Sequence, residues 1–113
     1  MSDQWREIDM YLKAHGVRIG PPTHGQTTGG KHSERSFHYA GTARDYGLWD
    51  SDAEAVARCL RPLAAARNSP LAELFFGPLN IWYQNGRRVS ANDIGGHMDH
   101  CHAALVPGRH LPR

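Results

Sequence analysis

Two short segments of the chain carry histidines and aspartates in a pattern that could bind a metal ion. The first contains His38 and Asp45, and the second contains Asp99, His100 and His102. Two imidazole nitrogens and one carboxylate, with a fourth position left to water, form the ligand set of a catalytic zinc site. The chain has eight histidines, and five of them fall in or beside these two segments, which further favours metal binding. We therefore expect the rest of the chain to bring the two segments together.

Spacing decides which of these side chains can face one site. In an extended segment the side chains at positions i and i+2 point the same way, so His100 and His102 can address one site, about 6–7 Å apart along the strand. His38 and Asp45 are seven residues apart, so a straight strand would direct them to opposite faces. If both are ligands, the chain must turn between them, and Gly41 is the residue that permits such a turn.

Periodicity and turn signals predict the elements that would position these segments. We expect helices over residues 3–14 and from about 51 to 67, and strands over 17–19, 36–46, 71–76, 79–84 and 99–105. The first helix would be capped by Asp3 and followed by Gly16. The second would begin with a capping box of Ser51 and Glu54. Two helices and about five short strands indicate an α+β fold with a small antiparallel sheet, in a single domain that spans residues 1–113.

Turns and loops separate these elements. Asn85-Gly86, followed by Arg87-Arg88-Val89, is a hairpin signal. Residues 20–35 and 91–98 are expected to be loops, and a long ordered loop in a small domain is more often functional than structural. The tail after Pro107 is polar and is expected to be loose. We assign five large aromatic residues to the core: Trp5, Trp49, Phe75, Phe76 and Trp82.

The composition suits an ordinary globular protein and limits its partners. The net charge of +2 is too small to argue for nucleic acid by itself. No run approaches the roughly 20 apolar residues that span a membrane, and the N-terminus lacks the apolar region of a signal peptide. We expect a soluble monomer made in the cytoplasm, which would act at the cell wall only after export or lysis. Cys59 and Cys101 form no disulfide framework and are expected to be buried free thiols.

The two metal-binding segments together resemble a known family. The first follows the pattern His-x-x-Gly-x-Ala-x-Asp, and the second reads Asp-His-x-His on the last predicted strand. In this respect the chain resembles the zinc D-Ala-D-Ala peptidase family and the related fold of the hedgehog signalling domain. The resemblance covers about residues 17–105. Its matching positions are Ser36, His38, Gly41, Ala43, Asp45, Asp99, His100 and His102.

The resemblance implies a role for each of these side chains. Zinc would be bound by His38, Asp45 and His102. His100 would lie beside the metal and act on the water or on the tetrahedral intermediate. Ser36 and Arg18 would contribute to substrate binding, Arg18 by meeting a substrate carboxylate. Zinc lowers the pKa of its bound water to about 7 and polarises the scissile carbonyl.

Two features depart from the family pattern. The first is the Arg that often lies on the early strand and binds the substrate carboxylate: the corresponding region here is residues 17–22, in which either Arg18 serves or the role is absent. The second is the general base. Many members carry a Glu a few residues before the last His ligand, where this chain has Gly95, Gly96 and His97. A general base must therefore come from elsewhere. The candidates are His100, Asp99, Glu73 and His97. His100 is the first choice, because strand geometry places it on the same face as the last ligand. Read alone, His97 is an exposed loop histidine, and Glu73 can equally be a strand residue that faces solvent.

We therefore expect a zinc metallopeptidase, of carboxypeptidase or endopeptidase type, from a phage or bacterial cell-wall system. Its partners would be the stem or cross-link peptides of peptidoglycan, with no nucleic acid and no membrane. One alternative is a non-catalytic zinc-binding module of the same fold. Another is a His-metal-finger phage nuclease, which residues 99–102 also resemble. That nuclease needs a further strand, a helix and a late Asn or His, yet only eleven residues follow His102, and the first segment would remain unexplained.

Overall fold

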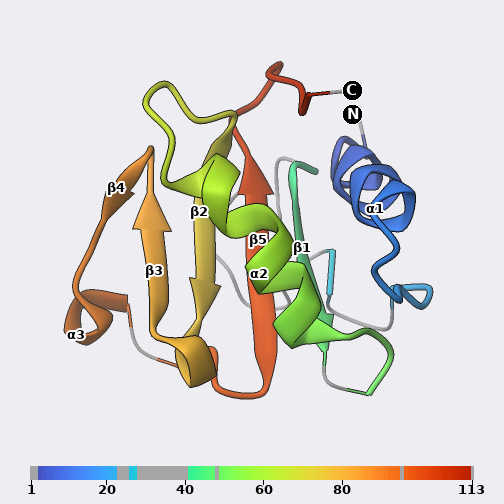
Figure 1. The fold of residues 1–113 in the computed structure, drawn as a ribbon, viewed down its shortest axis with the longest axis horizontal. Helices are drawn as coiled ribbons and strands as arrows, with labels where there is room; N and C mark the ends of the chain where they lie inside the picture. Colours follow the sequence, from blue (N-terminus) through green and yellow to red (C-terminus); the bar gives the residue numbers. More distant parts are fainter. Residues whose placement is uncertain (1–2, 23–25, 28–40, 48, 95, 113) are drawn as a thin grey trace.

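The computed structural model describes residues 3–22, 26–27, 41–47, 49–94 and 96–112. The elements in these residues are α1 (Trp5–Ala14), β1 (Ala43–Gly47), α2 (Ala53–Ala64), β2 (Leu71–Phe76), the 3-10 helix η1 (Gly77–Leu79), β3 (Ile81–Gln84), β4 (Arg87–Arg88), α3 (Ala91–Ile94) and β5 (His100–Leu105). The strands form one five-stranded antiparallel sheet in the order β1-β5-β2-β3-β4 (Figure 1). The predicted α+β class with an antiparallel sheet is confirmed.

The last strand of the chain, β5, lies inside the sheet. It pairs with β1 on one side and with β2 on the other. As a result His102 is opposite Asp45 on β1 and opposite Phe75 on β2. This topology brings the late histidine motif against a residue that lies 57 positions earlier in the sequence.

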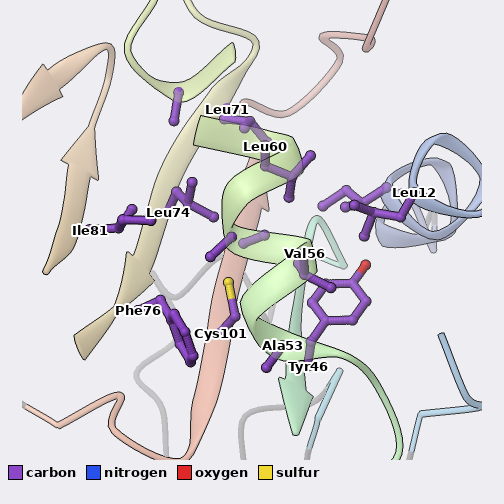
Figure 2. Packing of buried hydrophobic residues seen from close by; sticks show 14 of the residues in the cluster. Leu12, Tyr46, Ala53, Val56, Leu60, Leu71, Leu74, Phe76, Ile81 and Cys101 are labelled. Atoms are coloured by element: carbon purple, nitrogen blue, oxygen red, sulfur yellow. The ribbon is translucent and has the colours of Figure 1, made fainter. Parts of the chain in front are cut away.

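Helices α1 and α2 cover the same face of the sheet, with α2 running across it and α1 beside β1 (Figure 1). Apolar residues recur along α2 at helical spacing, and Val56 and Leu60 are fully buried. They meet Leu12 from α1 and Tyr46 and Cys101 from the sheet (Figure 2). Burial of each large apolar side chain contributes about 1.5–3 kcal/mol, so this layer fixes the strands that carry the site.

A polar network lies inside this apolar layer and ties α1 to β1. The guanidinium of Arg44 is fully buried, and it donates to Asp9 Oδ2 at 2.7 Å and to the carbonyl of Gly20 at 2.6 Å. The hydroxyl of Tyr46 donates to Asp9 Oδ1 at 2.6 Å. The guanidinium carbon of Arg44 also lies 4.6 Å from the centre of the Tyr46 ring. A buried cation paired in this way fixes the angle between helix and strand.

The end of α1 agrees with the sequence and its start does not. Gly16 follows the helix at φ +79°, and its amide donates to the carbonyl of Lys13, as in a Schellman motif. The N-cap, however, is Gln4 and not Asp3. The Asp3 carboxylate lies 3.5 Å from the Arg6 guanidinium, so it pairs with a side chain of the first turn and does not cap the backbone.

Helix α2 begins one residue later than the predicted capping box. Its N-cap is Asp52, whose carboxylate accepts a hydrogen bond from the amide of Ala55 at 3.1 Å. Ser51 is buried, and its hydroxyl donates to Asp50 Oδ1 at 2.9 Å. The helix ends at Ala64, three residues before the predicted end.

Two predicted strands are shorter than expected. Residues 17–19 contribute only an isolated bridge between Ile19 and Ser51. Strand β3 begins at Ile81, because the residues before it form η1, in which Pro78 offers no amide for strand pairing. The described part of the predicted strand 36–46 contributes β1.

The turns are mostly confirmed. Gly41 lies in a turn at φ +79°, as the spacing of the first motif requires, and Asn85-Gly86 closes the β3–β4 hairpin with positive φ at both residues. The predicted loop 91–98 contains one helical turn, α3. The predicted loop 20–35 lies largely outside the described residues.

The tail after β5 is held against α1 and is not loose. Gln4 Nε2 donates to the carbonyl of Arg109 at 2.7 Å. The Glu7 carboxylate accepts from the amide of Leu111 at 2.6 Å and lies 2.7 Å from His110 Nδ1. Leu111 is itself buried against the core cluster. The polar composition of the tail was therefore a poor basis for predicting that it is loose.

The prediction for Trp49 was wrong. Its side chain is 95% exposed in the turn between β1 and α2, where residue type alone does not decide burial. The other four aromatic residues assigned to the core are buried: Trp5, Phe75, Phe76 and Trp82. Cys59 and Cys101 are free thiols, as predicted, although Cys59 is only half-buried. In the described ranges, no helix has the length and apolarity required to cross a membrane.

Candidate functional site

The face of the sheet opposite the helices carries most of the predicted site. Side chains alternate along a strand, so residues paired across strands share a face. One row of such pairs runs across β1, β5, β2 and β3, and it consists of Asp45, His102, Phe75 and Trp82. Glu73 lies in the adjacent row. The sheet therefore brings together residues that the sequence places far apart.

His102 is held at both ring nitrogens. Its Nδ1 lies 3.0 Å from Asp45 Oδ1, and its Nε2 lies 2.8 Å from Glu73 Oε1. The ring is buried and stacks on Phe75, with 5.4 Å between the ring centres and 17° between the planes. The other oxygen of Glu73 accepts a hydrogen bond from Gln84 Nε2 at 3.3 Å. The orientation of the imidazole is thus fixed from three sides.

The two carboxylates determine the charge of this ring. Burial by itself lowers the pKa of His102, because it disfavours the charged form. The hydrogen bonds and negative charges of Asp45 and Glu73 outweigh burial and raise the pKa to about 9. Without a metal, the ring is an imidazolium at neutral pH and donates from both nitrogens. A metal ion at Nδ1 would displace one proton.

His100 occupies the same face, nearer to solvent. Its Nδ1 lies 2.7 Å from Asp99 Oδ1, and its Nε2 lies 4.0 Å from Asp45 Oδ2. The hydrogen bond and charge of His100 lower the pKa of Asp99 below the usual value for an aspartate. The Asp99 side chain is 85% exposed. His100 therefore has one nitrogen turned to an outer carboxylate and the other toward Asp45.

A cavity of about 450 Å³ opens over these side chains. Its lining residues are Asp45, Glu73, Phe75, Gly96, His97, His100 and His102. A larger hollow of about 600 Å³ lies between α1 and the tail, but the Glu7 carboxylate and His110 imidazole there bond to each other. The titratable groups of the predicted site line the smaller cavity.

His97 belongs to this cavity, although the sequence alone suggested an exposed loop histidine. It is half-buried, and its ring centre lies 5.2 Å from that of Phe75 and 4.9 Å from that of His100. Its backbone has φ +62°, which is uncommon for a residue with a side chain. Its carbonyl accepts a hydrogen bond from the amide of Gly77 at 2.8 Å, and a Cβ at Gly77 would overlap Met98 Sδ. The two glycines before His97 were the signal that could have indicated this bend.

Three further predicted site residues are not among the described residues of this cavity. His38 and Ser36 fall outside the described residues. Arg18 is exposed and does not line the cavity, and its carbonyl accepts a hydrogen bond from the amide of Asp52 at 2.9 Å. The structure therefore gathers Asp45, Glu73, His100 and His102, with Asp99 behind His100.

The donors that face each other fit a zinc ion. Two ligands of one tetrahedral zinc are about 3.4 Å apart when each bond is about 2.1 Å. Asp45 Oδ1 and His102 Nδ1 are 3.0 Å apart, so a small adjustment would let both bind one ion. A metal-bound imidazole usually donates its other N–H to a carboxylate, and Glu73 stands at that position. Among the residues that the structure describes, no three His, Cys, Asp or Glu are arranged to hold a metal, and the predicted third ligand, His38, lies outside them.

Comparisons of the chain with protein-family models, with curated proteins and with solved structures give no match.

Proposed function

We propose that the chain is a zinc-dependent peptidase that hydrolyses peptide bonds in the stem or cross-link of peptidoglycan. One observation carries the proposal: two carboxylates and two imidazoles from three adjacent strands, Asp45, Glu73, His100 and His102, line one cavity. The substrate class is supported by the resemblance of both motifs to the zinc D-Ala-D-Ala peptidase family, whose hedgehog-like fold we also propose for this chain.

Asp45 and His102, together with His38, would hold the zinc ion. When bound, zinc supplies Lewis acidity that polarises a peptide carbonyl and acidifies water. The ring of His102 rests on Phe75 and is bonded on its far side, so it requires little reorganisation to act as a ligand.

His100 is the residue that we assign to proton transfer. Its Nδ1 can donate to Asp99, which leaves the lone pair of Nε2 turned toward the cavity. Nε2 would take a proton from the attacking water as the carbon–oxygen bond forms. It would return that proton to the amine nitrogen as the carbon–nitrogen bond breaks. Water and peptide thus become a carboxylic acid and an amine, and His100 ends in its starting state.

Metal analysis and two substrates test the proposal. We expect the purified full chain to carry about one equivalent of zinc by mass spectrometry of the metal, and to release peptides from peptidoglycan but not to cut plasmid DNA. His102→Ala should lose both the zinc and the release, because it removes a ligand. His15→Ala is the matched control, since His15 lies beyond the end of α1 and bonds to the carbonyl of Tyr11. Wild-type protein without zinc would overturn the proposal.

A non-catalytic zinc-binding module is the second candidate. It is favoured by the engagement of Glu73 with His102 and Gln84. The other candidate bases, His97, Asp99 and His100, are all at least partly exposed. One equivalent of zinc with no peptide release would support this module. Zinc-independent cleavage of the plasmid would support the nuclease, although the described residues 106–112 after β5 form neither the strand nor the helix that it needs.

A further inference from the structure

Glu73 was a candidate general base, but its position gives it a different part in the site. Its Oε1 lies 2.8 Å from His102 Nε2, and its Oε2 accepts from Gln84 Nε2 at 3.3 Å. The carboxylate therefore lies at the edge of the imidazole that points away from Asp45. A base that activates water would instead need an oxygen directed at the water.

The backbone of β2 accounts for this position. Leu71 pairs with Leu105 and Glu73 pairs with Ala104, so two steps along β2 match one step along β5. The register shift therefore lies before Glu73, and from Glu73 onward β2 pairs regularly with β5. Because Phe75 pairs with His102, Glu73 lies two residues away on the same face, one row along from the His102 ring.

The two nitrogens of a neutral imidazole have different roles, since one donates a hydrogen and the other accepts. An imidazole can bind a metal only through the nitrogen that lacks hydrogen. Asp45, the partner of Nδ1, is itself a proposed metal ligand, whereas Glu73 faces Nε2. A hydrogen on Nε2 that is donated to Glu73 leaves the lone pair of Nδ1 directed at Asp45.

We propose that Glu73 is a positioning residue that accepts the Nε2 hydrogen of His102 and so presents Nδ1 to the metal. The inference rests on the proposed function, because it assumes that zinc binds between Asp45 and His102. Loss of an outer carboxylate of this kind typically weakens metal binding about 10–100-fold. Loss of a general base would instead leave binding intact and slow turnover by about 10²–10⁴-fold.

Zinc affinity, measured by competition with a chelating dye, distinguishes the two roles. We expect Glu73→Ala to raise the Kd for zinc about 10–100-fold. Glu73→Gln should raise it less, because an amide oxygen can still accept the Nε2 hydrogen. At saturating zinc, both variants should keep peptide release within about tenfold of wild type. Co²⁺ in place of zinc provides a second readout, since the visible spectrum of the Glu73→Ala complex should change with the ligand geometry.

Glu54→Ala and Glu54→Gln are the matched controls, because Glu54 lies on α2 and pairs with Arg58 at the surface. If Glu73→Ala fails to fold, the near-isosteric Glu73→Gln decides the question. Wild-type zinc affinity in the Glu73 variants would overturn the inference, and so would wild-type affinity combined with lost turnover, which would make Glu73 the base. Failure of the wild type itself to bind zinc would instead defeat the proposed function.

Discussion

Arg44 and Asp45 are neighbours on β1, and their side chains build two polar clusters on opposite faces of the sheet. The core cluster, beneath the helices, consists of Asp9, Arg44 and Tyr46. The site cluster, on the other face, consists of Asp45, Glu73 and His102. Each holds a positively charged group with carboxylate at hydrogen-bonding distance. The site cluster, in addition, borders a cavity lined by other titratable groups.

The difference lies in the cation and its surroundings. The charge of Arg44 is permanent, and its guanidinium is enclosed by protein. His102 can lose a proton, and its partners Asp45 and Glu73 have side chains that are 18% and 20% exposed. A permanent buried charge can only anchor the fold, whereas a titratable one beside a cavity can exchange a proton for a metal. Under the proposed function, β1 would therefore contribute stability through Arg44 and chemistry through Asp45.

The largest effect should follow from removal of the buried cation. We expect Arg44→Met to lower the free energy of unfolding by about 3–5 kcal/mol, because it leaves the buried Asp9 carboxylate without its cation, although the Tyr46 hydroxyl still donates to it. In metal-free protein, His102→Gln should cost only about 1–2 kcal/mol, because the carboxylates it leaves behind can reach water. Urea unfolding followed by circular dichroism measures both.

The double variant Asp9→Leu with Arg44→Met is the control for this comparison. It removes both charges and replaces them with apolar groups, so it should be more stable than Arg44→Met alone. If Arg44→Met and His102→Gln lowered the free energy of unfolding equally, the two clusters would not differ in their contribution to stability.

The pH dependence of stability should reveal the core cluster through Tyr46. Burial, with the charge of Asp9 and the hydrogen bond to it, raises the pKa of Tyr46 well above 10. In the unfolded chain the phenol ionises near 10, so the unfolded state binds fewer protons above that pH. The stability that Tyr46 confers is complete below pH 10 and is lost as the pH rises beyond it, by at most about 1.4 kcal/mol per pH unit.

Urea unfolding at several pH values between 9 and 11.5 tests this, with Tyr46→Phe as the comparison. The wild-type free energy of unfolding should fall more steeply above pH 10 than that of the variant, since the other tyrosines are common to both. If the free energy of unfolding changed with pH in the same way in the wild type and in Tyr46→Phe, the pH dependence could not be assigned to Tyr46.

Local patterns predicted most of the fold. Residues close together in the sequence determine four of the predicted elements: α2, β2, β5 and the turn at Asn85-Gly86. Their spacing and type were therefore enough to predict these elements. The predictions of a loose tail and of a buried Trp49 were wrong, because neighbours in sequence do not decide burial at these positions. Leu111 is buried where Gln4 and Glu7, more than a hundred residues away in the sequence, form hydrogen bonds to the tail. A local sequence pattern does not predict such contacts.

The site was predictable where spacing alone determines it. His100 and His102 share a face because they are two residues apart on a strand. The neighbours of His102 were not predictable in the same way, because the approach of Glu73 depends on the sheet order and on the register between β2 and β5. The position of His97 depends on a positive φ after two glycines and on close approach to Gly77.

The smallest effect should come from Asp99, and it sharpens the comparison inside the site. Each histidine of the late motif has a carboxylate beside the ring nitrogen to which we assign no chemistry, Glu73 for His102 and Asp99 for His100. Glu73 is largely buried, whereas Asp99 is 85% exposed. An exposed pair of this kind contributes only about 0.2–1 kcal/mol, so Asp99→Asn should reduce kcat/KM for peptide release by less than about tenfold. For the same reason the free energy of unfolding should fall by no more than about 1 kcal/mol. A loss of about a hundredfold or more would mean that Asp99 takes part in proton transfer, and exposure would then be a poor guide to which carboxylate of this site matters.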